Sequence, residues 1–262
     1  MGSGVSVIKI GGATFGNHDP IIEDVIELQR RGYDIVVVHG GARLVTEWLE
    51  RQGHPTRFVR GERVTDRPTL ETVTAVLAGL VNKEIVAQIN AGGGRAVGIS
   101  GVDGRLTTSR QRNDEMGYVG DVRQVDPAVL RSLLGAGFVP VIAPLSFFGI
   151  DRPEGAPAIL NINGDPLAGE LAATLKAERL IFLTDVAGVS DGHGNILSQL
   201  SVPEAEELLK NGVASGGMIP KLRACIRALS GTRTACIIDG RQPHALLRVT
   251  AGEGVGTTIR PG

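Results

Sequence analysis

The chain has 262 residues, enough to bury one large core or two lobes. Its 27 basic and 28 acidic residues give a formal net charge of −1, too little to attract nucleic acid or an anionic membrane surface, so neither partner is expected. Two cysteines make no disulfide framework and favour a cytoplasmic protein, and no apolar run reaches the roughly 18 residues of a membrane span.

Short β-branched runs alternate along the chain with longer segments whose apolar residues recur every three or four positions. This alternation predicts an α/β fold in which helices cover both faces of a parallel sheet. In chain order we expect strand 5–10, helix 20–31, strand 34–40, helices 43–52 and 69–90, strand 95–100, helix 127–136, strand 138–144, helix 165–177, strand 180–186, helices 203–211 and 219–230, and strand 235–240. Residues typical of hairpin turns occur at 102–105 and 190–195.

The first predicted strand contains a cation and is followed by two residues without side chains. Lys9 lies in the apolar run, and Gly11 and Gly12 come next, so backbone N–H groups can face an anion beside a compact ammonium group. Gly40 and Gly41 follow the next strand in the same way. Because open α/β sheets bind ligands at the carboxyl ends of their strands, we interpret both pairs as one phosphate or carboxylate pocket. An edge lysine with two tight turns is the alternative.

Several standard signatures are missing from the sequence. Neither G-x-x-x-x-G-K-[ST] nor a strand-linked G-x-G-x-x-G occurs, which argues against Walker-type NTPases and dinucleotide dehydrogenases. The sequence also has no G-x-S-x-G, no H-E-x-x-H and no Cys/His cluster. We therefore expect neither a serine or cysteine hydrolase nor a metal held by protein ligands.

Two later segments each place a charged residue at the start of a predicted helix. Residues 160–165 read LNINGD and place Asp165 before a helix, which is also typical of an Asx-rich turn and N-cap. Residues 215–221 read SGGMIPK and place Lys221 in the first turn of a helix. Since a cation there opposes the helix dipole by about 0.3–1 kcal/mol, we expect a negative group beside Lys221.

An ordered set of motifs resembles the amino acid kinase family, and within it the branch that phosphorylates N-acetyl-L-glutamate. The motifs run from Val5 to Ile259 and read KIGG, VVHGG, GERVTDRPTLE, AVGISGVDGRL, VGDV, FVPVIAP, NINGD, LTDVAGVSD, SGGMIPK, IIDGRQPHALL and GVGTTI. The resemblance implies a three-layer αβα sandwich with a mainly parallel open sheet and two lobes. Residues 1–165 would bind the acyl amino acid and form the dimer contact, and residues 166–262 would bind ATP.

The resemblance also implies the reaction. The γ-phosphoryl group of ATP would pass to the side-chain carboxylate of N-acetyl-L-glutamate, giving N-acetylglutamyl 5-phosphate for arginine biosynthesis, with Mg²⁺ held mainly through the nucleotide phosphates. A carboxylate with a pKa near 4.3 is already ionised at pH 7, so it needs no general base. Catalysis then depends on positioning and on charge neutralisation, which lysines and glycine amides supply.

Residue roles follow from the same resemblance. Lys9 and Lys221 match two lysines that grip the transferring phosphoryl group, and Asp165 matches the aspartate that orients them. Because nearby ammonium groups lower the pKa of a carboxyl group, Asp165 is expected to organise the site rather than act as a base. Substrate contacts are implied for Gly41, Ala42, Arg63 (to the α-carboxylate) and Asn161 (to the N-acyl group). Nucleotide contacts are implied for Gly11, Gly12, Thr184, Asp185, Val189, Gly216, Gly217 and Met218.

Two positions depart from the pattern of that branch, which commonly reads H-G-G-G and N-I-N-A-D. This chain has Ala42 and Gly164 instead. The alternative is a branch that phosphorylates aminoadipate or glutamate attached to an acidic carrier protein. Arginines at 43, 51, 57, 60, 63 and 67 would form a basic rim for such a carrier, or else a solvated surface with the interspersed acids.

A more remote alternative is a non-catalytic sensor of an acyl amino acid or nucleotide. Retention of Lys9, Lys221 and Asp165 argues against it, since sensing alone does not require charge on both sides of a transferred group. Arginine-inhibited members of the family carry an extra N-terminal helix that links dimers into a hexamer. Here the first predicted strand begins within about five residues of Met1, so we expect a homodimer. The tail at 251–259 nevertheless resembles the effector region of the inhibited members.

Overall fold

The structure is a computed structural model that describes residues 3–11 and 20–262. Its strands are β1 (Ser3–Ile10), β2 (Tyr33–His39), β3 (Phe58–Val59), β4 (Glu62–Arg63), β5 (Ala96–Gly101), β6 (Thr107–Gln111), β7 (Val119–Val125), β8 (Val139–Ile150), β9 (Ile159–Ile162), β10 (Arg179–Thr184), β11 (Gln199–Ser201), β12 (Thr234–Asp239) and β13 (Thr257–Arg260). Its helices are α1 (Pro20–Arg30), α2 (Ala42–Arg51), α3 (Arg67–Thr74), α4 (Asn82–Ala91), α5 (Ala128–Gly135), α6 (Gly164–Leu175), α7 (Val202–Lys210), α8 (Met218–Ala228) and α9 (Ala245–Thr250), with a π-helical turn η1 (Ala75–Val81) and a 3-10 turn η2 (Asp103–Arg105).

One mixed sheet organises the described part of the chain. Its strand order is β11-β13-β12-β10-β1-β2-β8-β6-β7-β9, and β5 also pairs with β8. The central strands β12, β10, β1, β2 and β8 run parallel to one another. Antiparallel pairs join β12 to β13, β6 to β7 and β8 to β9. The prediction of an α/β fold with a mainly parallel open sheet is confirmed.

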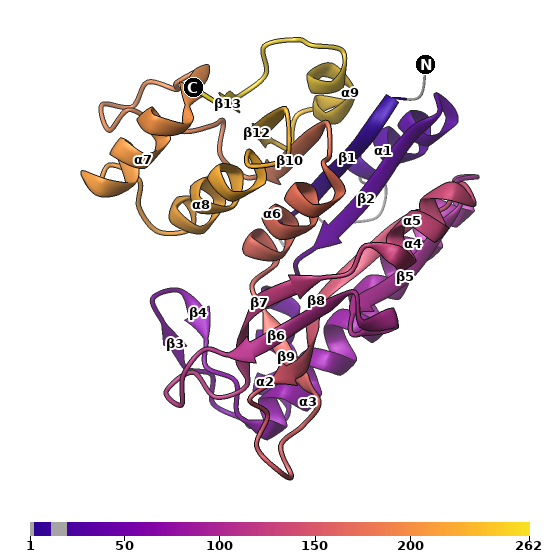
Figure 1. The fold of residues 1–262 in the computed structure, drawn as a ribbon, viewed down its shortest axis with the longest axis vertical. Coiled ribbons are helices and arrows are strands. Elements are labelled where there is room, and N and C mark those ends of the chain that lie inside the picture. Colours follow the sequence, from indigo (N-terminus) through magenta and orange to yellow (C-terminus); the bar gives the residue numbers. More distant parts are fainter. Residues whose placement is uncertain (1–2, 12–19) are drawn as a thin grey trace.

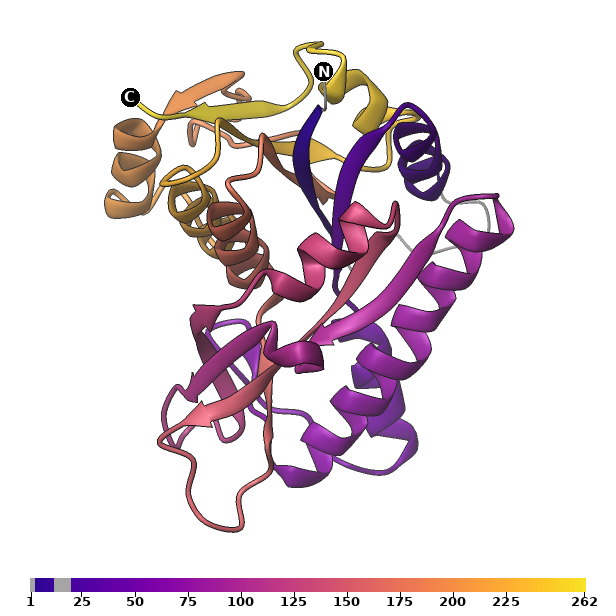
Figure 2. The ribbon, with the colours of Figure 1, turned by 45° about the vertical axis from the view of Figure 1, so that its right-hand side comes forward.

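Side chains of the central strands alternate between two hydrophobic cores, one on each face of the sheet. On β2, Ile35 and Val37 pack in the core that includes α1, α2, α3, α4 and α9. Val36 and Val38 pack in the other core, with α5, α6, α7 and α8. Because both faces of the strand are covered, it reads as a continuous apolar run rather than as an alternating one. Figures 1 and 2 show the resulting three layers.

The two ends of the molecule are built from different parts of the chain. Figure 1 shows α7, α8, α9 and β13, in orange and yellow, at the end that holds the C-terminus. The β3–β4 hairpin, α2 and α3 lie at the opposite end, with β1, β2 and α6 between the two. The carboxyl ends of the central strands thus face the region where residues from both parts meet.

The predicted strands and helices lie within two residues of those observed, except that β8 continues to Ile150 rather than ending at 144. Sequence analysis missed the hairpin β3–β4, strands β6, β7, β9, β11 and β13, and the short helix α9. The expected hairpin turn at 102–105 is wrong: residues 103–105 form η2, and β5 and β6, which flank it, both pair with β8. At 190–195 a hairpin turn is present, with Ser190 bridged to Ile196 and Asp191 N donating to Asn195 O at 3.0 Å.

Helix α3, the turn η1 and helix α4 form one continuous helix over Arg67–Ala91. Its 25 residues are long and apolar enough to cross a membrane by length and composition alone, a feature that sequence analysis missed. Apolar side chains along one face of it, among them Leu70, Leu77 and Ile85, are buried in the core, whereas Leu80 is exposed. We therefore describe it as a core helix; Figure 2 shows it running along one side of the molecule.

Candidate active site

Two lysines from distant parts of the chain converge on one buried carboxylate. Lys9 Nζ, from β1, lies 2.7 Å from Asp165 Oδ1, and Lys221 Nζ, from α8, donates to Asp165 Oδ2 at 3.0 Å. Asp165 is only 4% exposed, whereas both lysine side chains keep part of their surface accessible. The carboxylate therefore fixes the separation of two ammonium groups while leaving them able to meet an anion.

The alternation of β1 explains why Lys9 points this way. Ile8 and Ile10 lie in the core beneath α1, whereas Val7 lies in the core beneath α6 and α8. Since side chains two residues apart share a face of a strand, Lys9 is on the side of Val7 and reaches the start of α6. The reading of Lys9 as a solvent-facing edge lysine is wrong, because β1 lies between β10 and β2 and the side chain is buried.

The start of α6 holds Asp165 in place. The N-cap is Asn163, whose side chain accepts a hydrogen bond from Asp165 N at 3.0 Å. Asp165 itself lies in the first turn, where the positive end of the helix dipole favours a carboxylate. Leu167 and Leu171 anchor the helix in the core. The Asx cap expected in this segment is thus present, two residues earlier than Asp165.

Electrostatics keep Asp165 ionised. Burial raises the pKa of Asp165, but the charges and hydrogen bonds of Lys9 and Lys221 more than offset this, and the net pKa lies below its ordinary value. The expected direction of this pKa shift is confirmed; that Asp165 organises the site rather than accepting a proton stays a prediction. Asp165 is also the negative group expected beside Lys221, whose ammonium further donates to Gly217 O at 3.3 Å.

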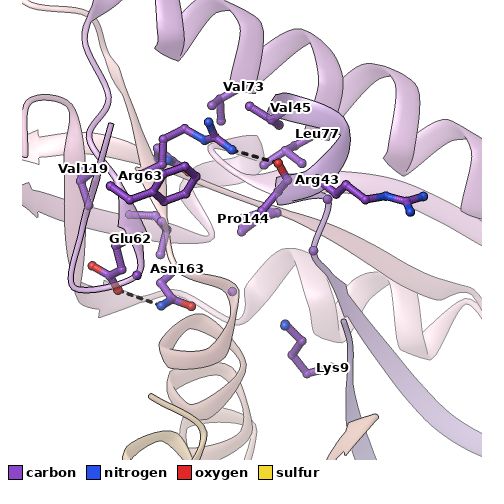
Figure 3. Close-up of a pocket in the computed structure, with 18 residues that line it drawn as sticks. Lys9, Arg43, Val45, Glu62, Arg63, Val73, Leu77, Val119, Pro144 and Asn163 are labelled. Carbon is purple, nitrogen blue, oxygen red and sulfur yellow. Dashed lines mark hydrogen bonds between the residues drawn. The ribbon is translucent and has the colours of Figure 1, made fainter. Parts of the chain in front are cut away.

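A cavity of about 400 Å³ opens beside Lys9 (Figure 3). All the residues that line it lie between Lys9 and Gly164 in the sequence. The predicted substrate residues are brought together in its wall; they are Gly41, Ala42, Arg63 and Asn161. Apolar side chains such as Val45 and Leu77 line it as well. The cavity thus combines an apolar wall with two buried cations, Lys9 and Arg63.

Arg63 is the second buried cation of this cavity. It is 8% exposed, and its Nη2 donates to Ala42 O at 2.9 Å and to Thr46 Oγ1 at 2.7 Å. Its guanidinium lies 4.8 Å from the ring centroid of Phe58. Burial lowers the pKa of Arg63 from its ordinary value, and Nη1 is buried with no hydrogen-bond partner among the described residues. A buried donor in this state requires an acceptor, which a bound anion would provide.

Gly41 cannot be replaced without strain. Its φ is +150°, and a Cβ atom built on it would lie 2.6 Å from Leu77 Cδ2, closer than any normal contact. Ala42 begins α2, and its carbonyl is the acceptor that holds Arg63. On the opposite wall, Asn161 of β9 donates from Nδ2 to Thr65 Oγ1 at 3.0 Å. Gly41, Ala42, Arg63 and Asn161 therefore belong to one packed arrangement.

A buried histidine supports the glycine pair from behind, and sequence analysis did not single it out. His39 donates from Nδ1 to Gly40 O at 2.8 Å and accepts from Asn82 Nδ2 at Nε2, at 3.2 Å. Burial lowers the pKa of His39 from 6.5 to about 4, so the ring is neutral at physiological pH. Its position directly before Gly40 and Gly41 is the signal that could have found it.

The predicted nucleotide residues lie around the carboxyl end of β10 and the start of α8. Gly11 N donates to Leu183 O at 3.2 Å, and Thr184 Oγ1 donates to Asp185 Oδ1 at 3.2 Å. Val189 is buried, and its N–H donates to Thr257 Oγ1 at 2.8 Å. Gly216, Gly217 and Met218 lead into α8 immediately before Lys221. Gly12 lies outside the described residues.

Over 3–11 and 20–262, no group of three or more His, Cys, Asp or Glu side chains is placed to hold a metal ion.

The protein is thus an αβα sandwich in which one carboxylate holds two lysines at the carboxyl end of β1, beside a cavity that contains the buried guanidinium of Arg63. Such an arrangement suits the binding of an anionic group. The comparison with known families makes this specific. The amino acid kinase family matches residues 4–239, and the chain belongs to this family.

The chain is similar over nearly its full length to curated acetylglutamate kinases. It is 50% identical over 255 residues to the one from Dehalococcoides mccartyi (strain CBDB1), covering 97% of this chain and 94% of that protein. The one from Roseobacter denitrificans is 45% identical over 259 residues, covering 97% of this chain and 88% of that protein.

Solved structures agree on the fold. N-acetylglutamate synthase from Neisseria gonorrhoeae, complexed with coenzyme A and N-acetyl-glutamate, superposes with a TM-score of 0.84 at 26% identity. The match covers 99% of this chain but only 60% of that larger protein. Carbamate kinase from Giardia lamblia gives a TM-score of 0.72 at 18% identity and supports the fold alone.

Proposed function

We propose that this chain catalyses the ATP-dependent phosphorylation of the side-chain carboxylate of N-acetyl-L-glutamate, giving N-acetylglutamyl 5-phosphate in arginine biosynthesis. Membership of the amino acid kinase family and 42–50% identity to acetylglutamate kinases over nearly the whole chain support this activity. The observation that carries the proposal is the pair Lys9 and Lys221 on Asp165, next to a cavity in which Arg63 has a buried donor to satisfy.

The cavity suits a small dicarboxylate with an acyl group. We assign the α-carboxylate to Arg63, whose Nη1 is buried without a partner in the described chain, and the acyl group to the region of Asn161. The side-chain carboxylate would then lie toward Lys9 at the other side of the cavity. A volume of about 400 Å³ is in the usual range for sites that enclose small molecules.

The reaction requires no proton transfer in this arrangement. An oxygen of the ionised side-chain carboxylate attacks the γ-phosphorus, the bond from that phosphorus to the bridging oxygen of ADP breaks, and ADP leaves with the electron pair. Lys9 and Lys221 neutralise charge on the transferring group from two sides. Asp165 keeps the two ammonium groups apart and oriented, so the chain contributes positioning and electrostatic stabilisation.

We assign the acyl amino acid to residues 1–165 and ATP to residues 166–262. The first assignment is supported by the cavity, all of whose lining residues lie at or before Gly164. The second is supported by the family resemblance of Thr184, Asp185 and residues 216–218, which lie at the carboxyl end of β10 and at the start of α8, the helix that carries Lys221. Mg²⁺ is proposed to arrive with ATP, held mainly through phosphate oxygens and water, as in other kinases, where it neutralises phosphate charge.

The proposed assembly is a cytoplasmic homodimer. Size-exclusion chromatography with light scattering tests the assembly, and a hexamer would contradict it.

The arginines considered as a rim for a carrier protein are partly neutralised. Arg43 lies 3.6 Å from Glu47 and Arg67 lies 3.7 Å from Glu71, in exposed pairs one helical turn apart. Arg63 is buried in the cavity and unavailable to a macromolecule. These contacts favour a free acyl amino acid over one attached to an acidic carrier.

The test is ATP-dependent acyl phosphate formation trapped with hydroxylamine. The substrates are free N-acetyl-L-glutamate, glutamate and aminoadipate, and the variants are Lys9→Ala and, as a matched control, Lys210→Ala at an exposed position of α7. We expect turnover of N-acetyl-L-glutamate alone, abolished by Lys9→Ala and unchanged by Lys210→Ala. Turnover of none of the three by the wild-type chain would overturn the proposal and favour a carrier-linked substrate or a non-catalytic sensor.

A further inference from the structure

The β3–β4 hairpin carries a carboxylate that the proposed reaction does not use. Glu62 is in β4, beside Arg63, and lies in the wall of the cavity. Its side chain is 26% exposed, and it faces the start of α6 (Figure 3). An acidic group in a cavity that binds an anion would oppose binding unless it were neutralised and had another task.

Both oxygens of Glu62 are engaged by the protein. Oε1 accepts a hydrogen bond from Asn163 Nδ2 at 2.8 Å, and Oε2 forms an ion pair with Arg112 Nη1. Arg112 in turn donates from Nε and Nη2 to Asp121 Oδ1, at 2.9 and 2.7 Å. Glu62 is therefore neutralised by an arginine that is itself held on β7, and it is not placed to bind a ligand cation.

The contact with Asn163 leads directly to the catalytic carboxylate. An asparagine side chain has one acceptor oxygen and one donor nitrogen. In Asn163 the nitrogen donates to Glu62, and the oxygen accepts from Asp165 N at 3.0 Å. These two bonds fix which way the amide faces, and the backbone of Asp165 is fixed with it. Asp165 then holds Lys9 and Lys221.

We propose that Glu62 is a positioning residue for phosphoryl transfer, acting through Asn163 on Asp165, and that Arg112 holds Glu62 in place. The path joins the hairpin that lines the cavity assigned to the acyl amino acid to the carboxylate that spaces the two lysines. The position of the β3–β4 hairpin is thereby coupled to the position of Asp165 and of the two lysines that it holds. This inference rests on the proposed function for its kinetic test, but its structural test is independent of turnover.

The kinetic test compares Glu62→Leu, which removes the acceptor, with Glu62→Gln, which keeps an acceptor oxygen for Asn163 and loses only the charge. We expect Glu62→Leu to lower kcat by about 10- to 100-fold, as misplacement of a catalytic group does, with the KM for ATP unchanged. Glu62→Gln should keep most of kcat. The matched control is Glu71→Leu, which removes an exposed, ion-paired carboxylate of the same lobe and should change nothing.

The structural test follows the amide proton of Asp165 by hydrogen exchange, using NMR on the full chain without substrates. We expect its exchange to be roughly 10-fold faster in Glu62→Leu and unchanged in Glu62→Gln, because only the former frees the cap. If Glu62→Leu does not fold, Asn163→Ser replaces it in the kinetic arm, since serine keeps the cap acceptor but not the donor to Glu62. It should show the same loss of kcat with an unchanged KM for ATP.

The outcomes separate the two proposals. A wild-type chain without turnover refutes the proposed function, while the exchange measurement still decides the role of Glu62. If the wild-type chain turns over substrate and Glu62→Leu has the same kcat and the same exchange rate at the Asp165 amide, only the positioning role of Glu62 is overturned. Loss of kcat in Glu62→Leu and Glu62→Gln with wild-type exchange of the Asp165 amide in both also overturns it, because the effect would then not pass through the cap of α6.

Discussion

His39 and Asn82 meet behind the glycine pair of the cavity, with 3.2 Å between the imidazole Nε2 and the amide Nδ2. Asn82 also donates to Val141 O at 2.9 Å, so it joins the long helix to both β2 and β8. This geometry requires a neutral imidazole, because Nε2 must accept a hydrogen bond while Nδ1 donates to Gly40 O. Protonation of His39 would place a donor against a donor.

The first prediction concerns stability in acid. The folded-state pKa of His39 is about 4, against 6.5 in the unfolded chain, so between these values the unfolded state binds more protons. Stability therefore falls as the pH is lowered through this window, by up to about 3 kcal/mol. Urea unfolding at pH 7, 5.5 and 4.5 measures it. Carboxyl groups that titrate in this range affect the wild type and His39→Gln alike. The stability of His39→Gln should therefore fall less than that of the wild type over the same pH range. An equal fall in both would contradict the lowered pKa of His39.

The second prediction concerns Asp165→Asn. This substitution leaves two ammonium groups close together without their shared counter-charge, so we expect the free energy of unfolding to fall by about 3 kcal/mol. The rate should fall by about 10²- to 10³-fold, because the lysines are no longer held on two sides of the phosphoryl group. Chemical denaturation and acyl phosphate formation measure the two effects. Wild-type kcat in this variant would show that Asp165 does not organise the site.

The third prediction concerns Arg63→Lys. Lysine cannot keep the bonds to Ala42 and Thr46 and also satisfy an anion in the cavity, because it lacks the planar fork of guanidinium. We expect the KM for N-acetyl-L-glutamate to rise about 10- to 100-fold with the KM for ATP unchanged. Initial-rate kinetics with each substrate varied in turn measure both. A rise in the KM for ATP instead would place the acyl amino acid elsewhere.

The fourth prediction compares two glycines of the cavity. Gly41→Ala puts a Cβ atom against Leu77 at a φ of +150°, and should destabilise the protein by about 1–3 kcal/mol. Gly164→Ala puts a Cβ atom 3.2 Å from the flexible stem of Lys9, which can shift, and should cost less. Thermal unfolding of the two variants provides the comparison. Adding Leu77→Ala to Gly41→Ala should reduce the clash, and an equal cost for both glycines would argue against this packing.

Sequence patterns predicted the central sheet because its strands are buried on both faces and read as apolar runs. Strands such as β6, with the sequence TTSRQ, were missed because they are short and polar and depend on pairing with β8. The pairing of Lys9 and Lys221 on Asp165 was predicted from family resemblance, while physical reasoning alone gave only the need for a negative group near Lys221. Contacts between segments distant in the sequence, such as Glu62 with Asn163, depend on tertiary packing that no local pattern encodes.

The π-helical turn η1 sets the rotation between the two halves of the long helix. On one side of it α3 packs against α2 and β9, and on the other α4 packs against β5 and α1. A π turn holds about one residue more than an α turn, so η1 keeps the two halves in their present phase by taking up one extra residue. Removal of one residue from α3, which has no such surplus, would rotate η1 and α4 by about 100° relative to the start of the helix. Leu77 would then leave Gly41, and Asn82 would leave His39. The angular phase of this helix is thus a length-sensitive element of the cavity: we expect a single-residue deletion to be tolerated better inside η1 than in α3.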